Sequence, residues 1–328
     1  MLDKTIIITG GNSGLGYECA KCIAASKQGW RIVIAGRSKQ KTVEAAKKLN
    51  DITPNSQVTA LPLDLASLQS VRNFVEEFAA QDLPPLRALV CNAGIQVVSG
   101  TTFTEDGFET TFGVNHLGHF LLANLLIKGL VAPARIVIVS SDTHDPAQKT
   151  GMPEPFYDNA ASLAFPEWAI NLPQNDSAIG KRRYTTSKLC NIYFTYELSR
   201  RLEKQGLSTN EKPITVNAFN PGLMPGTGLA RDYHPIQRFA WNYILPVIRP
   251  ISKSFMRMNS VHESGQALAR LVLDPSLEKV SGKYYSGLKE EPSSKESYDS
   301  KKAFELWESS VEIVKLAQEE TLLQSLSN

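Results

Sequence analysis

Short apolar runs alternate with helical patterns along most of the chain. The runs lie at 5–8, 31–35, 57–63, 86–91, 134–141, 214–219 and 283–285, and the helical patterns lie at 17–28, 39–50, 67–80, 108–130, 184–205 and 261–273. Runs rich in β-branched residues and without polar alternation are typical of parallel strands buried on both faces. The alternation predicts an α/β fold with a doubly wound, Rossmann-type parallel sheet of about seven strands. No interdomain linker interrupts it, so we expect one domain over 1–328.

The first run leads directly into a glycine-rich loop, Thr9–Gly16, and then into a helical pattern. A strand, a glycine loop and a helix in this order are typical of nucleotide binding, because backbone amides and the helix N-terminus favour an anion. Gly10 would permit the tight turn, Gly14 would let the backbone approach a pyrophosphate, and Gly16 would let the helix pack closely on the strand. The other candidates for cofactor contact in this loop are Asn12, Ser13 and Leu15. A structural turn without a ligand is the alternative.

The second run ends in Gly36-Arg37-Ser38, where an NAD-dependent enzyme usually carries an acidic residue for the ribose 2′-hydroxyl. That acid is missing. Arg37 instead offers a planar cation that can pair with a 2′-phosphate, and Lys39 and Lys41 lie nearby. The sequence therefore predicts NADPH/NADP+ as the cofactor, with a solvated arginine at a strand end as the alternative.

Further polar or turn-forming residues follow the later runs, at the sheet edge where doubly wound folds bind ligands. Asp64 follows the third run and could hydrogen-bond an adenine or cap the next helix. The remaining cofactor candidates are Leu65, Asn92, Ala93, Gly94, Pro221, Gly222 and Thr227. Ser141 closes the fifth run and is the candidate for substrate contact. Asn115 lies inside a helical pattern, where a poor helix former indicates a polar contact or a local bend.

Tyr184 and Lys188 place a phenol and an ammonium four residues apart on one face of a predicted helix. An ammonium beside a phenol favours the phenolate and lowers a pKa that starts near ~10. The pair therefore predicts acid–base chemistry. Tyrosine and lysine at this spacing also occur on ordinary amphipathic helices, so the pattern gains weight only from the rest of the chain.

Three segments lie outside this alternation. Residues 142–180 form a long insertion, and a loop of this length is usually functional or disordered. Its apolar residues predict a lid, with a passive surface insertion as the alternative: Met152, Phe156, Tyr157, Phe165 and Trp168. Residues 224–260 are predicted to cap a substrate, and the apolar part at 239–248 also suits peripheral membrane contact. Residues 299–324 predict a charged amphipathic helix at the rim.

The composition excludes several classes of protein. A net charge of +2 and no long basic run argue against nucleic acid as a partner and favour a small-molecule substrate. Four cysteines fit a reducing compartment, and no signal peptide or apolar run of transmembrane length occurs, so we expect a soluble, cytoplasmic protein. Cys19 and Cys22 are expected to be packing residues. His116 and His119 have a spacing compatible with metal ligation but no clustered partners, so no metal site is predicted.

Several motifs occur together and in order: Thr9-Gly10-x-x-x-Gly14-x-Gly16, Asn92-Ala93-Gly94, Asn115, Ser141, Tyr184-x-x-x-Lys188 and Pro221-Gly222. In this combination the chain resembles the short-chain dehydrogenase/reductase family over most of residues 4–285. The resemblance implies that Tyr184 is the proton donor and that Lys188 lowers its pKa and holds the ribose. It also implies that Ser141 orients the carbonyl and that Asn115 supports a water-linked proton relay.

Within that family, three stretches are most similar to the light-dependent protochlorophyllide reductases and their retinol-dehydrogenase-like relatives: 89–93, 115–122 and 187–191. We expect an NADPH-dependent reductase that delivers hydride to an apolar ketone or aldehyde while Tyr184 protonates the oxygen. One alternative is light-dependent C=C reduction of a protochlorophyllide-like pigment. Another is a catalytically silent NADPH sensor, which would need only the glycine loop. The sequence makes no prediction of oligomeric state.

Overall fold

A single sheet forms the centre of the protein, which is described here by a computed structural model for residues 2–53, 57–166, 177–247 and 258–323. The strands are β1 (Lys4–Thr9), β2 (Trp30–Gly36), β3 (Gln57–Pro62), β4 (Leu86–Cys91), β5 (Leu130–Val139), β6 (Ile214–Asn220), β7 (Lys283–Ser286) and β8 (Lys289–Glu291). Their order is β3-β2-β1-β4-β5-β6-β7-β8, and all neighbours except β7 and β8 are parallel. The chain leaves β1 first to one side and then to the other, as predicted for a doubly wound sheet.

The strand β8 is absent from the sequence prediction. It pairs antiparallel with β7 through a two-residue turn, Gly287-Leu288, in which Gly287 has a φ of 58°. A glycine between two strands is a hairpin signal, because it adopts positive φ without a steric penalty. The charged sequence of β8 hides it from a search for apolar runs, since this edge strand is largely exposed.

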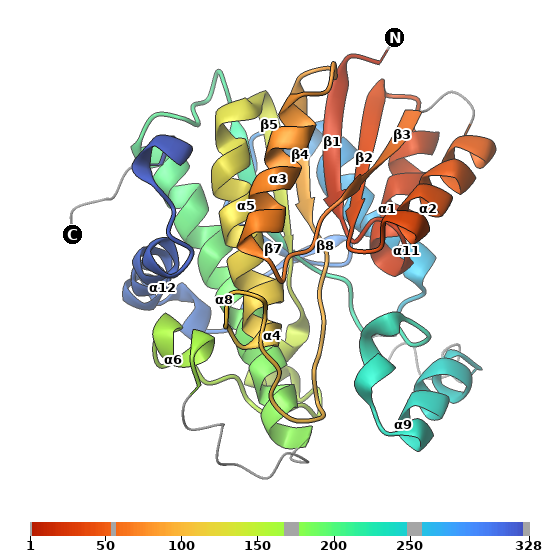
Figure 1. Ribbon diagram of the computed structural model, residues 1–328, viewed down its shortest axis with the longest axis vertical. Helices are drawn as coiled ribbons and strands as arrows, with labels where there is room; N and C mark the ends of the chain where they lie inside the picture. Colours follow the sequence, from red (N-terminus) through yellow and green to blue (C-terminus); the bar gives the residue numbers. More distant parts are fainter. Residues whose placement is uncertain (1, 54–56, 167–176, 248–257, 324–328) are drawn as a thin grey trace.

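Helices cover both faces of the sheet (Figure 1). They are α1 (Gly14–Ala25), α2 (Lys39–Ile52), α3 (Leu68–Ala79), α4 (Thr110–Phe112), α5 (Gly118–Leu126), α6 (Ala160–Ala164), α8 (Ser177–Lys204), α9 (Pro235–Phe239), α11 (Val261–Leu273) and α12 (Ser300–Ile313). The helices α1, α2 and α11 bury apolar side chains against one face, and α3, α5 and α8 bury theirs against the other. Each face therefore has its own core, which explains why the central strands lack polar alternation.

The helix predicted at 108–130 is interrupted at Asn115. A turn of π-helix over Gly113–Leu117 joins α4 to α5, and a 3₁₀ turn follows α5 before β5 begins. A π-helical turn widens the helix locally and is common at functional sites. The sequence prediction of a polar contact or a local bend at Asn115 is confirmed.

Two further predicted helices, at 184–205 and 299–324, have different bounds in the structure. The helix α8 begins at Ser177, so Tyr184 lies inside the helix rather than at its head, and the end of the predicted insertion is helical. The prediction of a helix over 299–324 is wrong in length, since α12 ends at Ile313. Lys315 adopts a left-handed φ of 50°, and Leu316 N–H donates to the Val311 carbonyl at 3.0 Å, which closes the helix as a Schellman motif.

The helix α12 also lies deeper than the rim position predicted for it. It packs along α8, and its side chains Ala303, Leu306 and Trp307 belong to the core on that face. Figure 1 shows α12 outside α8 and shows the parallel strands running toward the end of the molecule where α6 and α9 lie. The carboxyl ends of the strands therefore meet the insertion and the predicted cap at one edge of the sheet.

Candidate active site

A cavity of about 960 Å³ follows the carboxyl ends of β1, β2 and β4. The predicted cofactor residues that line it are Gly10, Asn12, Ser13, Gly14, Leu15, Arg37, Asp64, Leu65, Asn92, Ala93, Gly94, Tyr184, Lys188, Pro221 and Thr227. Gly16 and Gly222 do not line this cavity, and Gly222 lines a second, adjoining cavity instead. A Cβ at Gly16 would lie 2.6 Å from the Gly10 carbonyl oxygen, so Gly16 lets α1 pack closely on the loop that follows β1, whereas the sequence predicted packing on the strand itself.

The glycine loop fits a phosphate-bearing ligand. Gly14 has a φ of 55° and open space where a Cβ would point, so the backbone of the first helical turn is reachable from the cavity. The N-cap residue Ser13 makes no side-chain hydrogen bond to that turn, and no acidic residue occupies it. Unfilled amide donors at a helix N-terminus favour an anion. These are the residues that would hold the pyrophosphate of a dinucleotide.

The Thr9 side chain fixes the turn after β4 against the glycine loop. Its Oγ1 accepts hydrogen bonds from the backbone N–H groups of Asn92 and Ala93, each at 2.9 Å. The Asn92 side-chain amide donates back to the Thr9 carbonyl at 2.7 Å, and the His119 ring lies 2.9 Å from Thr9 Oγ1. Asn92 therefore shapes the cofactor cavity by positioning the loop.

The part of the cavity next to the end of β2 carries several cations. Arg37 is exposed there together with Lys41 and Lys48, and Arg231 reaches the same cavity from the segment after β6. Lys39, which the sequence placed near Arg37, does not line the cavity. Two carboxylates, Glu44 and Asp64, also line it. The cations outnumber the acids, so this end of the cavity attracts a phosphate.

Asp64 does not cap the next helix, which was one of its two predicted roles. Ser67 is the N-cap of α3, and its hydroxyl accepts a hydrogen bond from Ser70 N–H. Asp64 Oδ1 instead accepts from Ala66 N–H at 3.0 Å, which holds the strand-to-helix turn. The carboxylate remains at the cavity wall, so its contact with an adenine stays a prediction.

A second cavity of about 470 Å³ adjoins the first. Its lining combines apolar side chains with polar ones: Gln96, Ser140, Ser141, Asp142, Thr143, Gln148, Lys149, Thr150, Met152, Tyr184, Pro221, Gly222, Leu223, Met224, Thr227, Tyr233 and Trp241. Tyr184, Ser140 and Thr227 are among the residues that line both cavities. The Tyr184 phenol therefore lies where the two spaces meet. Ser141 lines the second one, and its contact with a substrate stays a prediction.

The structure corrects the predicted pKa of Tyr184. Burial raises that pKa above its ordinary value, the charges of Asp142 and Tyr233 raise it further, and a hydrogen bond with the Ser141 hydroxyl opposes them. Lys188 Nζ lies 5.5 Å from the centre of the Tyr184 ring, over its face. The prediction of a lowered pKa for Tyr184 is therefore wrong for the free protein, because burial is the largest influence on it. The phenol holds its proton at neutral pH, which is the state that a proton donor requires.

Lys188 is buried at the floor of the cofactor cavity. Its ammonium donates to the Val139 carbonyl at 3.2 Å, and burial lowers its pKa to about 8. Asn191 donates to the same carbonyl at 3.1 Å, and the Ser140 hydroxyl donates to the Lys188 carbonyl at 2.7 Å. These bonds lock α8 onto the end of β5 and keep the ammonium in place.

Asn115 links the turn after β4 to the catalytic helix. Its Nδ2 donates to the Ile95 carbonyl at 2.9 Å and to Ser187 Oγ at 3.0 Å, while its Oδ1 accepts from Ile95 N–H at 2.8 Å. Ser187 Oγ in turn donates to the Tyr184 carbonyl at 2.7 Å. The Asn115 side chain thus positions Tyr184 through Ser187, a residue the sequence gave no reason to single out. A water-linked relay at Asn115 stays a prediction.

His144 contacts the backbone of Ser141. Its Nδ1 lies 2.6 Å from the Ser141 carbonyl oxygen, and its Nε2 accepts from Ser294 N–H at 3.1 Å. Because Nε2 accepts, Nδ1 carries the proton and donates to Ser141. Burial lowers the pKa of His144. This contact could not be predicted, since Ser294 is distant in the sequence.

The chain is similar to known proteins in sequence and in fold. A family model described as short chain dehydrogenase matches residues 4–152, and one described as AcuH dehydrogenase domain matches residues 227–323. The WW domain-containing oxidoreductase of Danio rerio is 34% identical over 314 residues, which cover 95% of this chain and 68% of the relative. Protochlorophyllide reductase A of Triticum aestivum is 37% identical over 329 residues, which cover 95% of this chain and 80% of the relative.

The chain is a short-chain dehydrogenase. A crystal structure of an uncharacterized protein from Mycobacterium paratuberculosis, 27% identical, superposes with a TM-score of 0.66 and covers 95% of this dehydrogenase and 93% of that chain. The predicted family, and its branch near the protochlorophyllide reductases, are thereby confirmed. Family membership also confirms the prediction of a nicotinamide-dependent oxidoreductase.

Of the apolar residues predicted to form a lid in the insertion, only some lie at the active site of this dehydrogenase. Met152 lines the second cavity, whereas Phe156 and Phe165 are exposed. Tyr157 is buried against α8 instead, with its ring centre 5.4 Å from that of Tyr193. Trp168 lies outside the described residues. Closure of this segment over a ligand stays a prediction.

The predicted cap contributes Met224, Thr227, Tyr233 and Trp241 to the second cavity. The apolar part at 239–248 leaves Phe239, Tyr243, Ile244 and Val247 exposed, while residue 248 lies outside the described residues. Membrane contact through it stays a prediction. Within the described ranges, no helix combines the length and apolar character that crossing a bilayer requires.

His116, His119 and Cys19 are buried and take packing roles. His116 contacts Ser310 at 3.1 Å, and burial lowers the pKa of His116 to about 3 and that of His119 to about 4. Among the residues that the structure describes, no group of three or more His, Cys, Asp or Glu side chains is placed to hold a metal ion. Cys19 is free and buried in the core around α1, as expected of a packing residue.

Proposed function

We propose that this dehydrogenase is an NADPH-dependent reductase of an apolar ketone or aldehyde. The observation that carries the proposal is the position of Tyr184 at the junction of the two cavities. A cofactor in the larger cavity and a carbonyl compound in the smaller one would meet at this phenol. NADPH, when bound, supplies the hydride.

Tyr184 supplies the proton. As hydride adds to the carbonyl carbon, the C=O π bond breaks and its electron pair takes the Tyr184 proton, which yields an alcohol and a phenolate. The Ser141 hydroxyl, which hydrogen-bonds Tyr184, orients the carbonyl oxygen toward it. The Lys188 ammonium stabilises the phenolate that forms, because an opposite charge favours the ionised state.

The second cavity suits an apolar substrate with a few polar contacts. Met152, Leu223 and Trp241 give it apolar walls, while Gln96 and Tyr233 form a polar pair with their oxygens 3.0 Å apart. A volume of about 470 Å³ is that of a small-molecule site. The lining therefore favours a compound whose carbonyl is its main polar group.

Replacement of Arg37 by aspartate is expected to abolish the preference for NADPH, because it exchanges the cation facing the 2′-phosphate for an acid that binds a 2′-hydroxyl. We expect the parent to favour NADPH over NADH by about tenfold or more, or about 1.4 kcal/mol per tenfold step. Titration of both cofactors with parent and variant measures this. Equal affinities in the parent, or an unchanged preference in Arg37→Asp, would contradict the assignment.

Activity is expected to fall as pH rises through about 8, the pKa to which burial lowers Lys188. The ammonium loses its charge above that pH, whereas Tyr184 keeps its proton because its own pKa is raised. The ratio kcat/KM for NADPH reports groups of the free enzyme and should decline about tenfold per pH unit on this limb. A profile that stays flat through pH 9.5 would show that the Lys188 charge is not required.

A panel of apolar ketones and aldehydes, with NADPH consumption followed in light and in darkness, tests the proposed function. Turnover in darkness supports carbonyl reduction. The second candidate function is C=C reduction of a protochlorophyllide-like pigment, which the similarity to protochlorophyllide reductase A favours. Turnover of such a pigment only under illumination would decide for it. NADPH binding without turnover of any substrate would decide for a silent sensor.

A further inference from the structure

The segment after β6 carries an arginine and an aspartate side by side, and neither belongs to the predicted site. Arg231 and Asp232 end a 3₁₀ turn, Gly228–Asp232, which belongs to the predicted cap. Asp232 is directed at the loop after β4, whereas Arg231 lines the cofactor cavity. One short turn therefore lines the cofactor cavity and also contacts the loop after β4.

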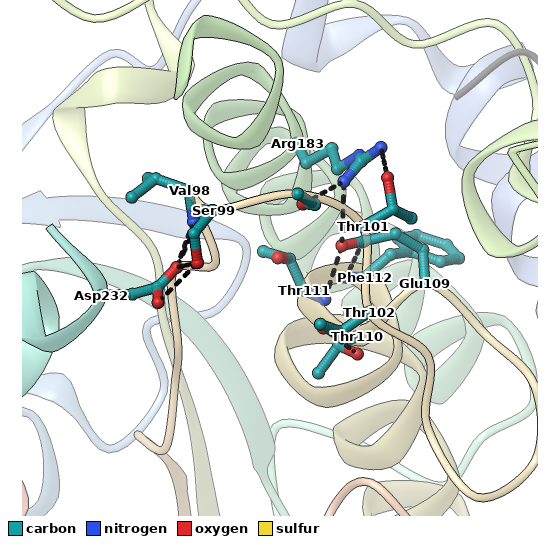
Figure 2. A network of polar contacts seen from close by, with 11 residues as sticks. Val98, Ser99, Thr101, Thr102, Glu109, Thr110, Thr111, Phe112, Arg183 and Asp232 are labelled. Atoms are coloured by element: carbon teal, nitrogen blue, oxygen red, sulfur yellow. Dashed lines mark hydrogen bonds and ion pairs between the residues drawn. The ribbon is translucent and has the colours of Figure 1, made fainter. Parts of the chain in front are cut away.

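Asp232 anchors this turn. Its carboxylate accepts hydrogen bonds from the backbone N–H groups of Val98 and Ser99 at 2.8 and 2.9 Å, and from Ser99 Oγ at 2.8 Å. Figure 2 shows Asp232 reaching across to these residues. Partial burial opposes ionisation, but the hydrogen bonds from Ser99 and Val98 hold the pKa of Asp232 below its ordinary value. The anchor is therefore charged at neutral pH.

The loop that receives Asp232 is itself tied to the catalytic helix. Arg183, next to Tyr184, donates to the Gly100 carbonyl at 3.2 Å and to Thr101 Oγ1 at 2.7 Å, and it lies 4.0 Å from the buried Glu109. Glu109 accepts from two N–H groups at the start of α4. Figure 2 shows these contacts beside those of Asp232, joined to them through the backbone of the same loop. The turn bearing Arg231 thus has a fixed position relative to the active site.

With the turn fixed, Arg231 lines the same cavity as Arg37. Neither guanidinium has a hydrogen bond or an ion pair with any residue in the described part of the chain. Burial lowers the pKa of Arg231, the charge of Arg37 lowers it further, and the charge of Asp232 opposes both effects. The two cations therefore lie within electrostatic range of one another. Two unpaired guanidinium groups of like charge repel each other unless an anion lies between them.

We propose that Arg231 and Arg37 together form a two-sided site for the 2′-phosphate of NADP(H), so that the cap as well as β2 selects the cofactor. The inference rests on the proposed function, because it assumes that the dinucleotide occupies the larger cavity. Each guanidinium offers several N–H donors in a plane, which suits a dianionic phosphate held from two directions. The bound phosphate also relieves the repulsion and stabilises the cap beside the substrate cavity.

Binding measurements on the full chain test the proposal, with 2′,5′-ADP and 5′-AMP as fragment probes beside NADPH and NADH. We expect Arg231→Gln to weaken NADPH and 2′,5′-ADP by about tenfold or more, as for a lost charge-assisted phosphate contact, and to leave NADH and 5′-AMP within about twofold. Arg231→Lys keeps the charge and should recover part of the loss. Arg238→Gln is the matched control, an exposed arginine of the same cap that does not line the cavity, and should change none of the affinities.

Three results would overturn the inference. If Arg231→Gln leaves NADPH binding unchanged while Arg37→Gln weakens it, Arg231 has no part in the site and the proposed function stands. If Arg231→Gln weakens NADH as much as NADPH, the residue supports the cap and does not read the phosphate. If the parent binds neither NADPH nor 2′,5′-ADP, the proposed function fails together with the inference.

Discussion

Tyr184→Phe is expected to lower kcat for carbonyl reduction by at least ~10²-fold, the loss typical of a removed general acid. The variant keeps the ring and removes the hydroxyl that lies where the two cavities meet. The Lys188 ammonium contacts the ring face and the Val139 carbonyl, and both contacts survive the change. NADPH affinity should therefore stay within about twofold, so that the whole effect falls on the chemical step.

Steady-state kinetics on the best carbonyl substrate, with NADPH binding measured separately, give both quantities. Tyr233→Phe is the matched control, because Tyr233 lines the same substrate cavity and its hydroxyl donates to Gln96 at 3.0 Å. It has no assigned proton to deliver, so we expect a loss below about tenfold. Near-normal kcat in Tyr184→Phe would mean that another group is the acid.

Arg201→Met is expected to lower the free energy of unfolding by about 3 kcal/mol, the lower end of the range for a buried ion pair that loses one partner. Arg201 belongs to α8, and its side chain is fully buried against α12. Its Nε lies 2.7 Å from Glu197, and its Nη2 lies 2.5 Å from Glu308. Its guanidinium carbon also lies 4.5 Å from the centre of the Trp307 ring. Methionine fills a similar volume but leaves the buried Glu197 carboxylate without its buried partner.

Urea unfolding of parent and variant measures this loss as a lower midpoint with an unchanged slope. Arg200→Met is the matched control, because Arg200 pairs with Glu197 at 2.6 Å from a more exposed position. We expect it to cost no more than about 1 kcal/mol. A loss below about 1 kcal/mol in Arg201→Met would show that the buried network does not hold α12 on the catalytic helix.

The parts of the molecule that depend on local patterns were predictable from the sequence. Buried parallel strands have unbroken apolar runs, so the sheet could be predicted. The order of strand, glycine loop and helix is a local signature, so the part of the cofactor cavity around Gly14 could be predicted as well. The position of Arg37 at the cofactor cavity could be predicted because the residue directly follows a strand. The hairpin strand β8 and the end of α12 at Lys315 were missed, since both depend on one residue with positive φ.

The residues missed at the active site reach it through tertiary contacts. None of the residues Ser187, His144 and Arg231 has a distinctive sequence spacing. Ser187 contacts Asn115, His144 contacts Ser294, and Arg231 lines the cofactor cavity. The direction of the Tyr184 pKa was wrong for the same reason. Spacing shows that Lys188 is near, but only the fold shows that the phenol is buried beside Asp142 and that the ammonium lies over the ring face.

The most direct test of the account is the destination of deuterium from NADPH labelled at C4 of the nicotinamide, followed in darkness with the best carbonyl substrate. We predict deuterium on the carbinol carbon of the product, with transfer slowed at least ~10²-fold in Tyr184→Phe. Deuterium on a carbon of a reduced C=C bond, or transfer that occurs only under illumination, would contradict carbonyl reduction as the activity of this dehydrogenase.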